Sequence, residues 1–387
     1  AAADKVLAKE RIDSLHAHYL NFYPELLKSP AARTKAEDIL KEHFEFLNIL
    51  LKISFNEAIQ RDILAQGELL STKLFHTLLE ELEIPAVLLP ALDFMSIDEN
   101  SEPELGQISE RLKALLSQYP DQQLFITQGY ICKNHRNEVD NLKRGGSDYT
   151  ASLVAAAIQA SVCEIWTDID GMHNNDPRVV DRTRPIAELS FDEAAELAYF
   201  GAKILHPASI WPAQLHNVPV RLLNTMDPAA AGTLIKAEVA ETGVKAIAAK
   251  DGITAINIKS SRMLLAYGFL RRIFEVFESF KTPIDMITTS EVAVSVTIDD
   301  LSHLEQIVEE LRRFGTVEVD SNQAIVCVVG NQVAETKGAI QSVMDSLVDI
   351  PVRMVSFGGS KHNVSILIDA QYKVQALKNL NEGVFNW

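Results

Sequence analysis

The spacing of apolar residues divides the chain into a helical beginning and an alternating remainder. Residues 1–80 carry apolar positions at helical spacing and contain few glycines or prolines, which predicts a helical N-terminal region. Apolar runs then predict strands within 84–94, 123–131, 163–171 and 218–224, a polar loop at 96–106, and helices in 151–160 and 190–217. Strands that alternate with helices indicate an α/β domain with a largely parallel central sheet. Ligands of such sheets bind beyond the carboxyl ends of strands, where we place the loops after Gly129, Asp168 and Asn224.

Two segments carry sharper local signals. Ser190 and Glu193 have the spacing of a capping box, and they start a segment that we expect to break into two helices near His206–Pro207. The stretch NLKRGGSDYTASLVAAAIQA (141–160) places two glycines before Ser147 and Asp148, which are good N-cap residues, and continues as a buried helix. A free helix N-terminus beside glycines can bind an anion. A tight turn before a core helix explains the same residues, so this stretch alone leaves both interpretations open.

The pattern changes after residues 224–243, which predict a domain boundary. Residues 252–320 predict the order strand, helix, strand, strand, helix, strand, and residues 323–382 repeat this order with one strand fewer. The upstream run 244–250 can supply that strand, which inserts the first unit inside the second. The stretches DMITTSEVAVSVTID and RMVSFGGSKHNVSILID also form a faint internal repeat of strand, polar turn and strand. The sequence therefore predicts two similar α+β modules, one nested in the other.

Composition narrows the class of protein. With 387 residues, of which 47% are hydrophobic, the chain is long enough for two or three domains with well-filled cores. A net charge of −17 argues against nucleic acid or an anionic membrane as a partner. No apolar run approaches the length of a membrane span, and the N-terminus lacks the apolar core of a signal peptide. The 3 cysteines are widely spaced and the 10 histidines lack ligand spacing, so we expect a reduced, cytoplasmic protein without a metal site of its own.

Six motifs in a fixed order resemble aspartate kinase (aspartokinase) of the single-function, lysine-sensitive type. They are AQGELLS (65–71), FITQGYI (125–131), RGGSDYTA (144–151), WTDIDGMHNNDPR (166–178), FGAKILHP (200–207) and PIDMITTSEVAVS (283–295). The resemblance implies an amino-acid-kinase fold followed by two α+β ACT domains of βαββαβ order, one nested in the other. We expect the catalytic domain at 1–240, the first ACT domain at 251–321, and the second ACT domain at 244–250 plus 322–387.

The resemblance implies transfer of the γ-phosphoryl group of ATP to the side-chain carboxylate of L-aspartate. The product, L-aspartyl 4-phosphate, is the first intermediate toward lysine, threonine and methionine. That carboxylate is ionised at neutral pH, so the enzyme has to align the reactants and neutralise charge. Arg144 is implied to fork onto the α-carboxylate, and Asp148 to be an active-site acid that orients the amine and the catalytic lysine. The implied substrate-binding residues are Glu68, Arg144, Gly145, Gly146 and Ser147.

Taken alone, Glu68 fits an exposed helix acid and Arg144 a solvated loop residue, and only the full motif set favours the site. The resemblance also implies the ATP-binding residues Thr167, Asp168, His173, Arg178, Lys203 and Ile204. His173 stands where relatives often carry an aromatic hydroxyl, which makes this contact the least secure of the six. Mg²⁺ is expected to be bound through the nucleotide phosphates rather than by a protein cage.

L-lysine is the implied allosteric inhibitor, bound by the first ACT domain. The implied effector residues are Met263, Ala266, Phe269, Leu270, Ile284, Asp285, Thr289, Ser290 and Glu291. Asp285 is expected at a strand position, where its carboxylate can pair with an ammonium group, although a solvated strand end explains the same residue. Ala266 stands where relatives can carry a serine, which removes one hydrogen bond. The open edges of ACT sheets and the pairing of these domains in the family imply a homodimer or higher homo-oligomer.

The sequence departs from the family at its beginning. The family opens on a strand that reads roughly Lys-Phe-Gly-Gly-Thr-Ser, whose lysine neutralises the transferring phosphoryl group, whereas this chain starts AAADKVLAKERID. Lys5 and Lys9 lie on a helical pattern and are poor substitutes. We expect this first strand to be missing from the 387 residues rather than from the native protein. Two alternatives stay open: a catalytically inactive amino-acid sensor, or another kinase of the same fold acting on glutamate or a nucleotide.

Overall fold

The computed structural model describes residues 2–143, 145–200, 207–260 and 267–385. The chain forms two compact units. One comprises 1–165 with 208–220, and the other comprises 166–207 with 221–387.

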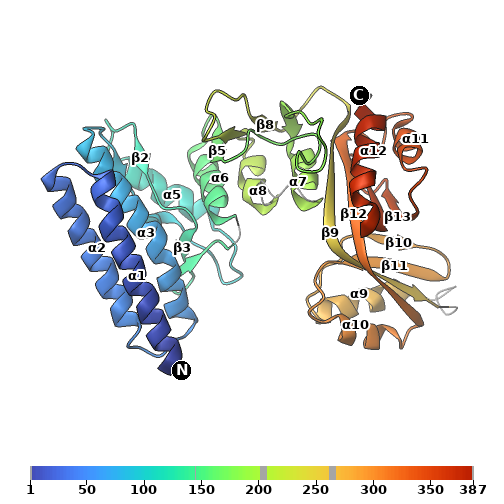
Figure 1. The fold of residues 1–387 in the computed structure, drawn as a ribbon, viewed down its shortest axis with the longest axis horizontal. Coiled ribbons are helices and arrows are strands. Elements are labelled where there is room, and N and C mark those ends of the chain that lie inside the picture. Colours follow the sequence, from blue (N-terminus) through green and yellow to red (C-terminus); the bar gives the residue numbers. More distant parts are fainter. Residues whose placement is uncertain (1, 144, 201–206, 261–266, 386–387) are drawn as a thin grey trace. The chain divides into compact units, whose positions relative to one another are not determined.

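Three long helices, α1 (Ala2–Leu26), α2 (Pro30–Leu50) and α3 (Glu57–Glu81), lie side by side in the first unit (Figure 1). Side chains start the second and third of them: the Ala32 N–H donates to Ser29 Oγ at 3.2 Å, and the Ile59 N–H donates to Asn56 Oδ1 at 2.9 Å. An apolar core lies between the helices, so the predicted helical N-terminal region is confirmed. Although these helices are long, no helix among the described residues is apolar enough to cross a membrane.

The rest of the first unit is α/β. Strands β1 (Val87–Leu88) and β2 (Phe125–Ile126) pair in parallel, and β3 (Ile131–Lys133) and β4 (Val139–Asn141) form an antiparallel hairpin. The helices are α4 (Ala91–Phe94), α5 (Leu105–Leu116), α6 (Gly146–Ile158) and α8 (Pro207–Leu215). The single strand predicted for 123–131 is wrong, because the backbone turns inside it. The Ile131 N–H donates to the Gly129 carbonyl at 2.7 Å, and Tyr130 has a φ of 66°.

A four-stranded sheet of order β5-β7-β8-β6 follows. Its strands are β5 (Cys163–Thr167), β6 (Glu188–Ser190), β7 (Val220–Asn224) and β8 (Thr233–Lys236), and β6 and β8 pair in parallel. Helix α7 (Phe191–Phe200) begins at the predicted capping box. The Ser190 N–H donates to Glu193 Oε2 at 2.7 Å, and the Glu193 N–H donates to Ser190 Oγ at 3.2 Å, so this prediction is confirmed.

The C-terminal sheet has six strands in the order β10-β11-β9-β12-β14-β13. They are β9 (Gly243–Lys259), β10 (Ile287–Thr289), β11 (Ala293–Ile298), β12 (Thr316–Asn331), β13 (Val352–Phe357) and β14 (Asn363–Asp369). The accompanying helices are α9 (Phe269–Ser279), α10 (Leu304–Leu311), α11 (Ala339–Ser346), the 3₁₀ turn η1 (Ala370–Tyr372) and α12 (Lys373–Phe385).

Strands β9 and β12 each run unbroken where the sequence predicted two strands. The end of β9 pairs with the start of β12, with Ile256 opposite Val319, and the start of β9 pairs with the end of β12, with Ala249 opposite Val326. The register is irregular between Asp320 and Ile325, where one half of the sheet gives way to the other. Residues 244–250 thus lie beside 325–330, which is the pairing that a nested arrangement needs. The limits of the individual domains stay a prediction.

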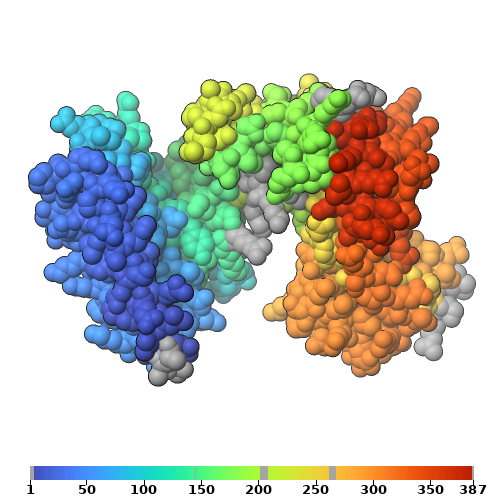
Figure 2. Space-filling view, viewed as in Figure 1, coloured from blue at the N-terminus to red at the C-terminus, as the bar shows by residue number. Residues whose placement is uncertain are grey.

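Each half of this sheet has its own apolar core. Helices α9 and α10 cover one half around Ile273 and Ile307, and α11 and α12 cover the other around Val343 and Leu377. Val180, from the loop after β5, is buried in the second core. Figure 2 shows the same connection, because the green segment that contains this loop and α7 packs directly against the red C-terminal helix. The loop after β5 is therefore built onto the C-terminal module.

The close approach of β9 and β12 yields a stability prediction. A Cβ on Gly330 would lie 1.9 Å from the carbonyl oxygen of Gly243, so Gly330→Ala forces two paired backbones apart. We expect a loss of about 1–3 kcal/mol in the free energy of unfolding, measured by denaturant unfolding. Gly359→Ala is the control, since nothing lies within 4 Å of its Cβ position. Equal stability of the two variants would contradict the tight pairing.

Candidate active site

The loop that enters α6 turns through left-handed backbone. Lys143 has a φ of 60° and Gly145 a φ of 67°, and Gly145 is the N-cap of a helix that begins at Gly146. Ser147 and Asp148 therefore lie in the first helical turn, and the prediction that they cap the helix is wrong. The physical reason is that glycine adopts positive φ without steric cost, so Gly145 takes the N-cap position in a left-handed conformation without a side-chain cap. Asp148 is then the acidic residue nearest the positive end of the helix dipole.

The start of α6 packs tightly against the turn at 129–130. A Cβ on Gly129 would lie 2.8 Å from Ser147 Oγ, and a Cβ on Gly146 would lie 2.5 Å from Tyr130 Cδ2. The Tyr130 N–H donates to Thr150 Oγ1 at 3.1 Å, which fixes the turn to the helix. Both glycines are therefore needed for close approach.

Glu68 of α3 reaches the same turn. Its carboxylate accepts a hydrogen bond from the Gly129 backbone, and burial nonetheless raises the pKa of Glu68. Burial also raises the pKa of Asp148. Two partly buried acids thus adjoin one glycine turn and the N-terminus of α6, and a cationic ligand stabilises their charged forms. The structure brings together Glu68, Gly145, Gly146, Ser147 and Asp148, while Arg144 lies outside the described residues.

A second candidate site is a cavity of about 730 Å³ inside the second unit. Thr167, Asp168, His173 and Arg178 all line it, together with other residues of the loop 167–179. Its remaining walls come from Leu197 of α7, residues 247–249 of β9, and Lys373 and Leu377 of α12. The predicted nucleotide residues that the structure describes are therefore brought together, and Lys203 and Ile204 lie outside the described residues.

The charged residues of this cavity are held by neighbours. Arg178 forms a two-pronged pair with Asp176, with Nε to Oδ1 and Nη2 to Oδ2 both at 2.9 Å, and this guanidinium lowers the pKa of Asp176. His173 Nε2 lies 2.7 Å from Asp170 Oδ1, and its Nδ1 lies 3.3 Å from Thr183 Oγ1. Both ring nitrogens of His173 thus have protein partners, which fixes the ring at the wall of the cavity.

The contribution of the C-terminal helix α12 to this cavity was not predicted from the sequence. Asn381 of α12 accepts hydrogen bonds from the side-chain amides of Asn174 (3.5 Å) and Asn175 (3.3 Å), and donates to the Arg182 carbonyl at 3.0 Å. The Asn175 amide also donates to the Leu377 carbonyl at 3.1 Å, and the Ile247 N–H of β9 donates to the Asn174 carbonyl at 2.8 Å. The adjacent asparagines at 174 and 175 were the one available signal, because polar residues in a buried loop need partners.

The predicted effector residues lie around the start of α9 and of β10. Phe269 and Leu270 open α9 after Gly268, whose φ is 75°, and Ser290 and Glu291 form an exposed turn after Thr289. Met263 and Ala266 lie outside the described residues. Strand β10 begins only at Ile287, so Ile284 and Asp285 precede it and the strand position predicted for Asp285 is wrong. The backbone before β10 nevertheless stays bonded to β11, because the Asp285 N–H donates to the Thr297 carbonyl and the Thr297 N–H donates to the Met286 carbonyl, each at 2.9 Å.

Asp285 is not a solvated strand end, since its side chain is 1% exposed. Its Oδ1 accepts hydrogen bonds from Lys250 Nζ at 2.8 Å and from the Tyr199 hydroxyl at 2.7 Å. Lys250 also pairs with Asp299 at 2.9 Å and lies 4.4 Å from the centre of the Tyr199 ring. The second oxygen, Asp285 Oδ2, is buried and has no hydrogen-bond partner among the residues that the structure describes. This carboxylate already holds one alkylammonium group and has an oxygen left to accept from another.

Comparison with known proteins decides the family. Residues 6–224 match the model of the amino acid kinase family, and residues 326–384 match that of an ACT domain. The chain is 32% identical over 375 residues to the lysine-sensitive aspartokinase 3 of Escherichia coli, covering 94% of this chain and 82% of that protein. It is 31% identical over 393 residues to the chloroplastic aspartokinase 2 of Arabidopsis thaliana, covering 95% of this chain and 72% of that protein. The chain belongs to the aspartokinase family.

Solved aspartokinase structures are similar in fold to this chain. The E. coli aspartokinase III complex with aspartate and ADP (R-state) superposes with a TM-score of 0.82 and 31% identity, covering 97% of this chain and 87% of that one. The complex of the same enzyme with lysine and aspartate (T-state) gives a TM-score of 0.79 at 31% identity, covering 97% of this chain and 86% of that one. The predicted amino-acid-kinase fold with ACT domains is confirmed. As an aspartokinase, the chain phosphorylates the side-chain carboxylate of L-aspartate with ATP.

Proposed function

We propose that the glycine turn with Glu68 and the first turn of α6 binds L-aspartate. The observation that carries this is the meeting of Glu68 and the α6 N-terminus at Gly129. Glu68 pairs with the substrate ammonium, and Asp148 orients the same amine and the catalytic lysine of the family. Arg144, between Lys143 and Gly145, forks onto the α-carboxylate. The substrate side-chain carboxylate is ionised at neutral pH, so alignment and charge neutralisation are sufficient for catalysis.

The cavity of the second unit takes ATP in this proposal. Apolar wall residues such as Leu197 and Ile247 suit the face of a nucleobase, and Arg178 supplies positive charge for phosphates. Thr167 ends β5 and Asp168 follows it, at the position where ligands meet an α/β sheet. Lys203 and Ile204 complete the set by family resemblance, and His173 contributes an edge held by Asp170.

Mg²⁺ accompanies the nucleotide. The cavity wall carries Asp168, Asp170 and Asp176, but the described residues form no cluster of three ligands placed to hold a metal ion. Such a wall fits Mg²⁺, which keeps several waters and binds through phosphates with one or two carboxylates. When bound, the ion neutralises developing charge on the phosphates.

L-lysine is the proposed inhibitor, bound at Asp285 beside the first turn of α9. Asp285 already accepts from the ammonium of Lys250, and its free Oδ2 can accept from a second amine. The exposed turn of Ser290 and Glu291 and the backbone beside Phe269 offer groups for the remaining amine and the carboxylate. Strand β10 is an edge of the sheet and Ile287 on it is exposed, which supports a homodimer or higher oligomer through the ACT domains.

Removal of Arg144 tests the aspartate site. Arg144→Ala should lower kcat/KM for aspartate by the equivalent of about 2–5 kcal/mol, because a bound carboxylate loses its charged partner. Steady-state kinetics at varied aspartate measures the effect, and circular dichroism checks the fold. Arg136→Ala, an exposed arginine eight residues upstream, is the matched control. A normal aspartate dependence in Arg144→Ala would remove this residue from the site.

Asn381 tests the nucleotide cavity. Asn381→Ala should raise KM for ATP several-fold and leave KM for aspartate unchanged, because each lost hydrogen bond to the 174–182 loop is worth about 1 kcal/mol. Asn331→Ala is the control, since its amide likewise donates to two carbonyls, of Val239 and Glu241, outside the cavity wall. If both variants lose thermal stability equally and neither changes KM for ATP, α12 has only a structural role.

Asp285 tests the inhibitor site. Asp285→Ala should keep kinase activity and lose inhibition by L-lysine, because coupling of about 1–3 kcal/mol depends on differential binding at this pocket. Asp299→Ala, which removes the other carboxylate on Lys250, should stay lysine-sensitive. Inhibition curves measure both variants, and light scattering on the same samples reports the oligomeric state. Full lysine sensitivity in Asp285→Ala, or inhibition of the parent by threonine instead of lysine, contradicts the assignment.

A further inference from the structure

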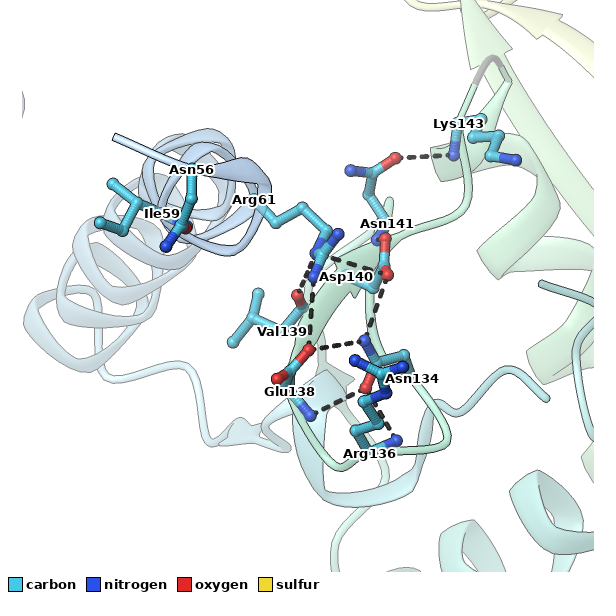
Figure 3. A network of polar contacts seen from close by, with 10 residues as sticks. All are labelled: Asn56, Ile59, Arg61, Asn134, Arg136, Glu138, Val139, Asp140, Asn141 and Lys143. Carbon is cyan, nitrogen blue, oxygen red and sulfur yellow. Dashed lines mark hydrogen bonds and ion pairs between the residues drawn. The ribbon is translucent and has the colours of Figure 1, made fainter. Parts of the chain in front are cut away.

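The β3–β4 hairpin is held to helix α3 by one arginine. Arg61 Nε donates to the Val139 carbonyl at 3.1 Å and lies 3.5 Å from Asp140 Oδ2, while Nη2 lies 3.3 Å from Glu138 Oε2. Figure 3 shows the guanidinium reaching from the helix to these three acceptors. The Arg61 side chain is 22% exposed, so most of it is buried in this contact. A planar fork with several donors is the group that can serve all three oxygens at once.

The hairpin that Arg61 holds is itself cross-linked. Asn134 Oδ1 accepts from the backbone N–H groups of Arg136 and Glu138, each at 3.0 Å. Asn134 Nδ2 donates to Glu138 Oε2 at 3.2 Å, so this carboxylate oxygen is held by the hairpin turn and by Arg61 together (Figure 3). A displacement at Arg61 is therefore passed to the whole hairpin rather than absorbed by one side chain.

From the hairpin, hydrogen bonds lead into the proposed substrate loop. The Asn141 N–H donates to Asp140 Oδ1 at 2.8 Å, and the Lys143 N–H donates to Asn141 Oδ1 at 3.1 Å. The Gly146 N–H then donates to the Lys143 carbonyl at 3.2 Å, at the first residue of α6. Asp140, the residue that faces Arg61, is thus the start of a series of hydrogen bonds that runs through Asn141 to Lys143 (Figure 3) and ends at Gly146, the first residue of α6.

Helix α3 carries both Arg61, which holds the hairpin, and Glu68, which contacts the glycine turn. Arg61 and Glu68 are seven residues apart, which places them two turns apart on one face of the helix. Glu68 contacts the Gly129 backbone directly, and Arg61 fixes the hairpin that leads to the loop. We propose that Arg61 is a positioning residue for the kinase reaction: it sets the distance between Glu68 and the 141–148 loop, and with it the affinity for L-aspartate. This inference rests on the aspartate site proposed above.

The charge balance of the hairpin explains why this position needs a cation. Removal of Arg61 takes away the cation that pairs with the carboxylates of Glu138 and Asp140, which then face α3. The neighbouring Asp62 adds a third acid at this position. Desolvation raises the pKa of Asp62, Arg61 lowers it and Glu138 raises it again, so these groups interact electrostatically. Like charges repel the hairpin from the helix, which widens the spacing that Arg61 maintains.

The test is the kinetics of Arg61→Gln. We expect KM for aspartate to rise at least about tenfold, because a misplacement of about 1 Å can cost a hundredfold in a positioned reaction. KM for ATP should not change. Arg61→Lys, which keeps the charge and loses the fork, should fall between the parent and Arg61→Gln. Arg33→Gln is the control, because that arginine also binds two carbonyls, of Pro24 in α1 and of Leu27 just after it. It should leave both KM values unchanged.

The partner residues keep the proposal testable if Arg61→Gln does not fold. Asp140→Asn should then raise KM for aspartate in the same direction, since Asp140 links Arg61 to Asn141. An unchanged KM for aspartate in folded Arg61→Gln, or equal rises in both KM values, overturns the positioning role. Glu68→Gln tests the proposed aspartate site separately from the positioning role of Arg61. If Glu68→Gln leaves KM for aspartate unchanged, the site is wrong, whereas an effect of Glu68→Gln without one of Arg61→Gln refutes only the present inference.

Discussion

The antiparallel pairing of β9 with β12 is the constraint on which the second unit depends. Both halves of the six-stranded sheet are built on this pair, and its first residues hold three different elements in place. Lys245 pairs with buried Glu193 of α7 at 3.3 Å, and the Ile247 N–H binds the Asn174 carbonyl of the cavity loop. Lys250 binds Asp285 in front of β10. A strand that is fixed along its whole length gives these contacts a common frame, because its backbone groups are already satisfied by the ladder.

The same strand contacts Asp285, which we propose binds the inhibitor, and lines the cavity that we propose binds ATP. Residues 247–249 form part of the cavity wall, and the next residue along β9 is Lys250. Helix α7 is connected to the same region at both ends, since Glu193 contacts Lys245 and Tyr199 donates to Asp285. Burial and the bond to Asp285 both raise the pKa of Tyr199, so its hydroxyl keeps its proton and remains a donor. Coupling between two sites needs a physical connection of this kind, in which one group responds to both.

Local sequence rules predicted many helices and strands, but they did not predict contacts between residues that lie far apart in the sequence. The capping box at Ser190 and Glu193 is confirmed because all of its atoms lie within one turn, and the pairing of 244–250 with 325–330 followed from a missing strand in a repeated pattern. The strand predicted through Gly129 failed because a turn inside an apolar run leaves no clear periodic signal. Arg61 and Asn381 were missed for a different reason: their partners lie about 77 and 206 positions away in sequence, so only the folded chain joins them.

Burial of Glu68 and Asp148 has a thermodynamic consequence for the proposed aspartate site. Burial raises both pKa values above those of the unfolded chain, so these acids favour folding at low pH and this contribution is lost as pH rises through their folded pKa values. The charged forms of both acids are therefore less favourable in the folded chain than in the unfolded one. An ammonium group bound beside either carboxylate would favour its charged form, while Gly129 and Gly146 keep the glycine turn and the start of α6 closely packed. A ligand that carries its own ammonium group would offset this cost in the proposed site, and L-aspartate is such a ligand.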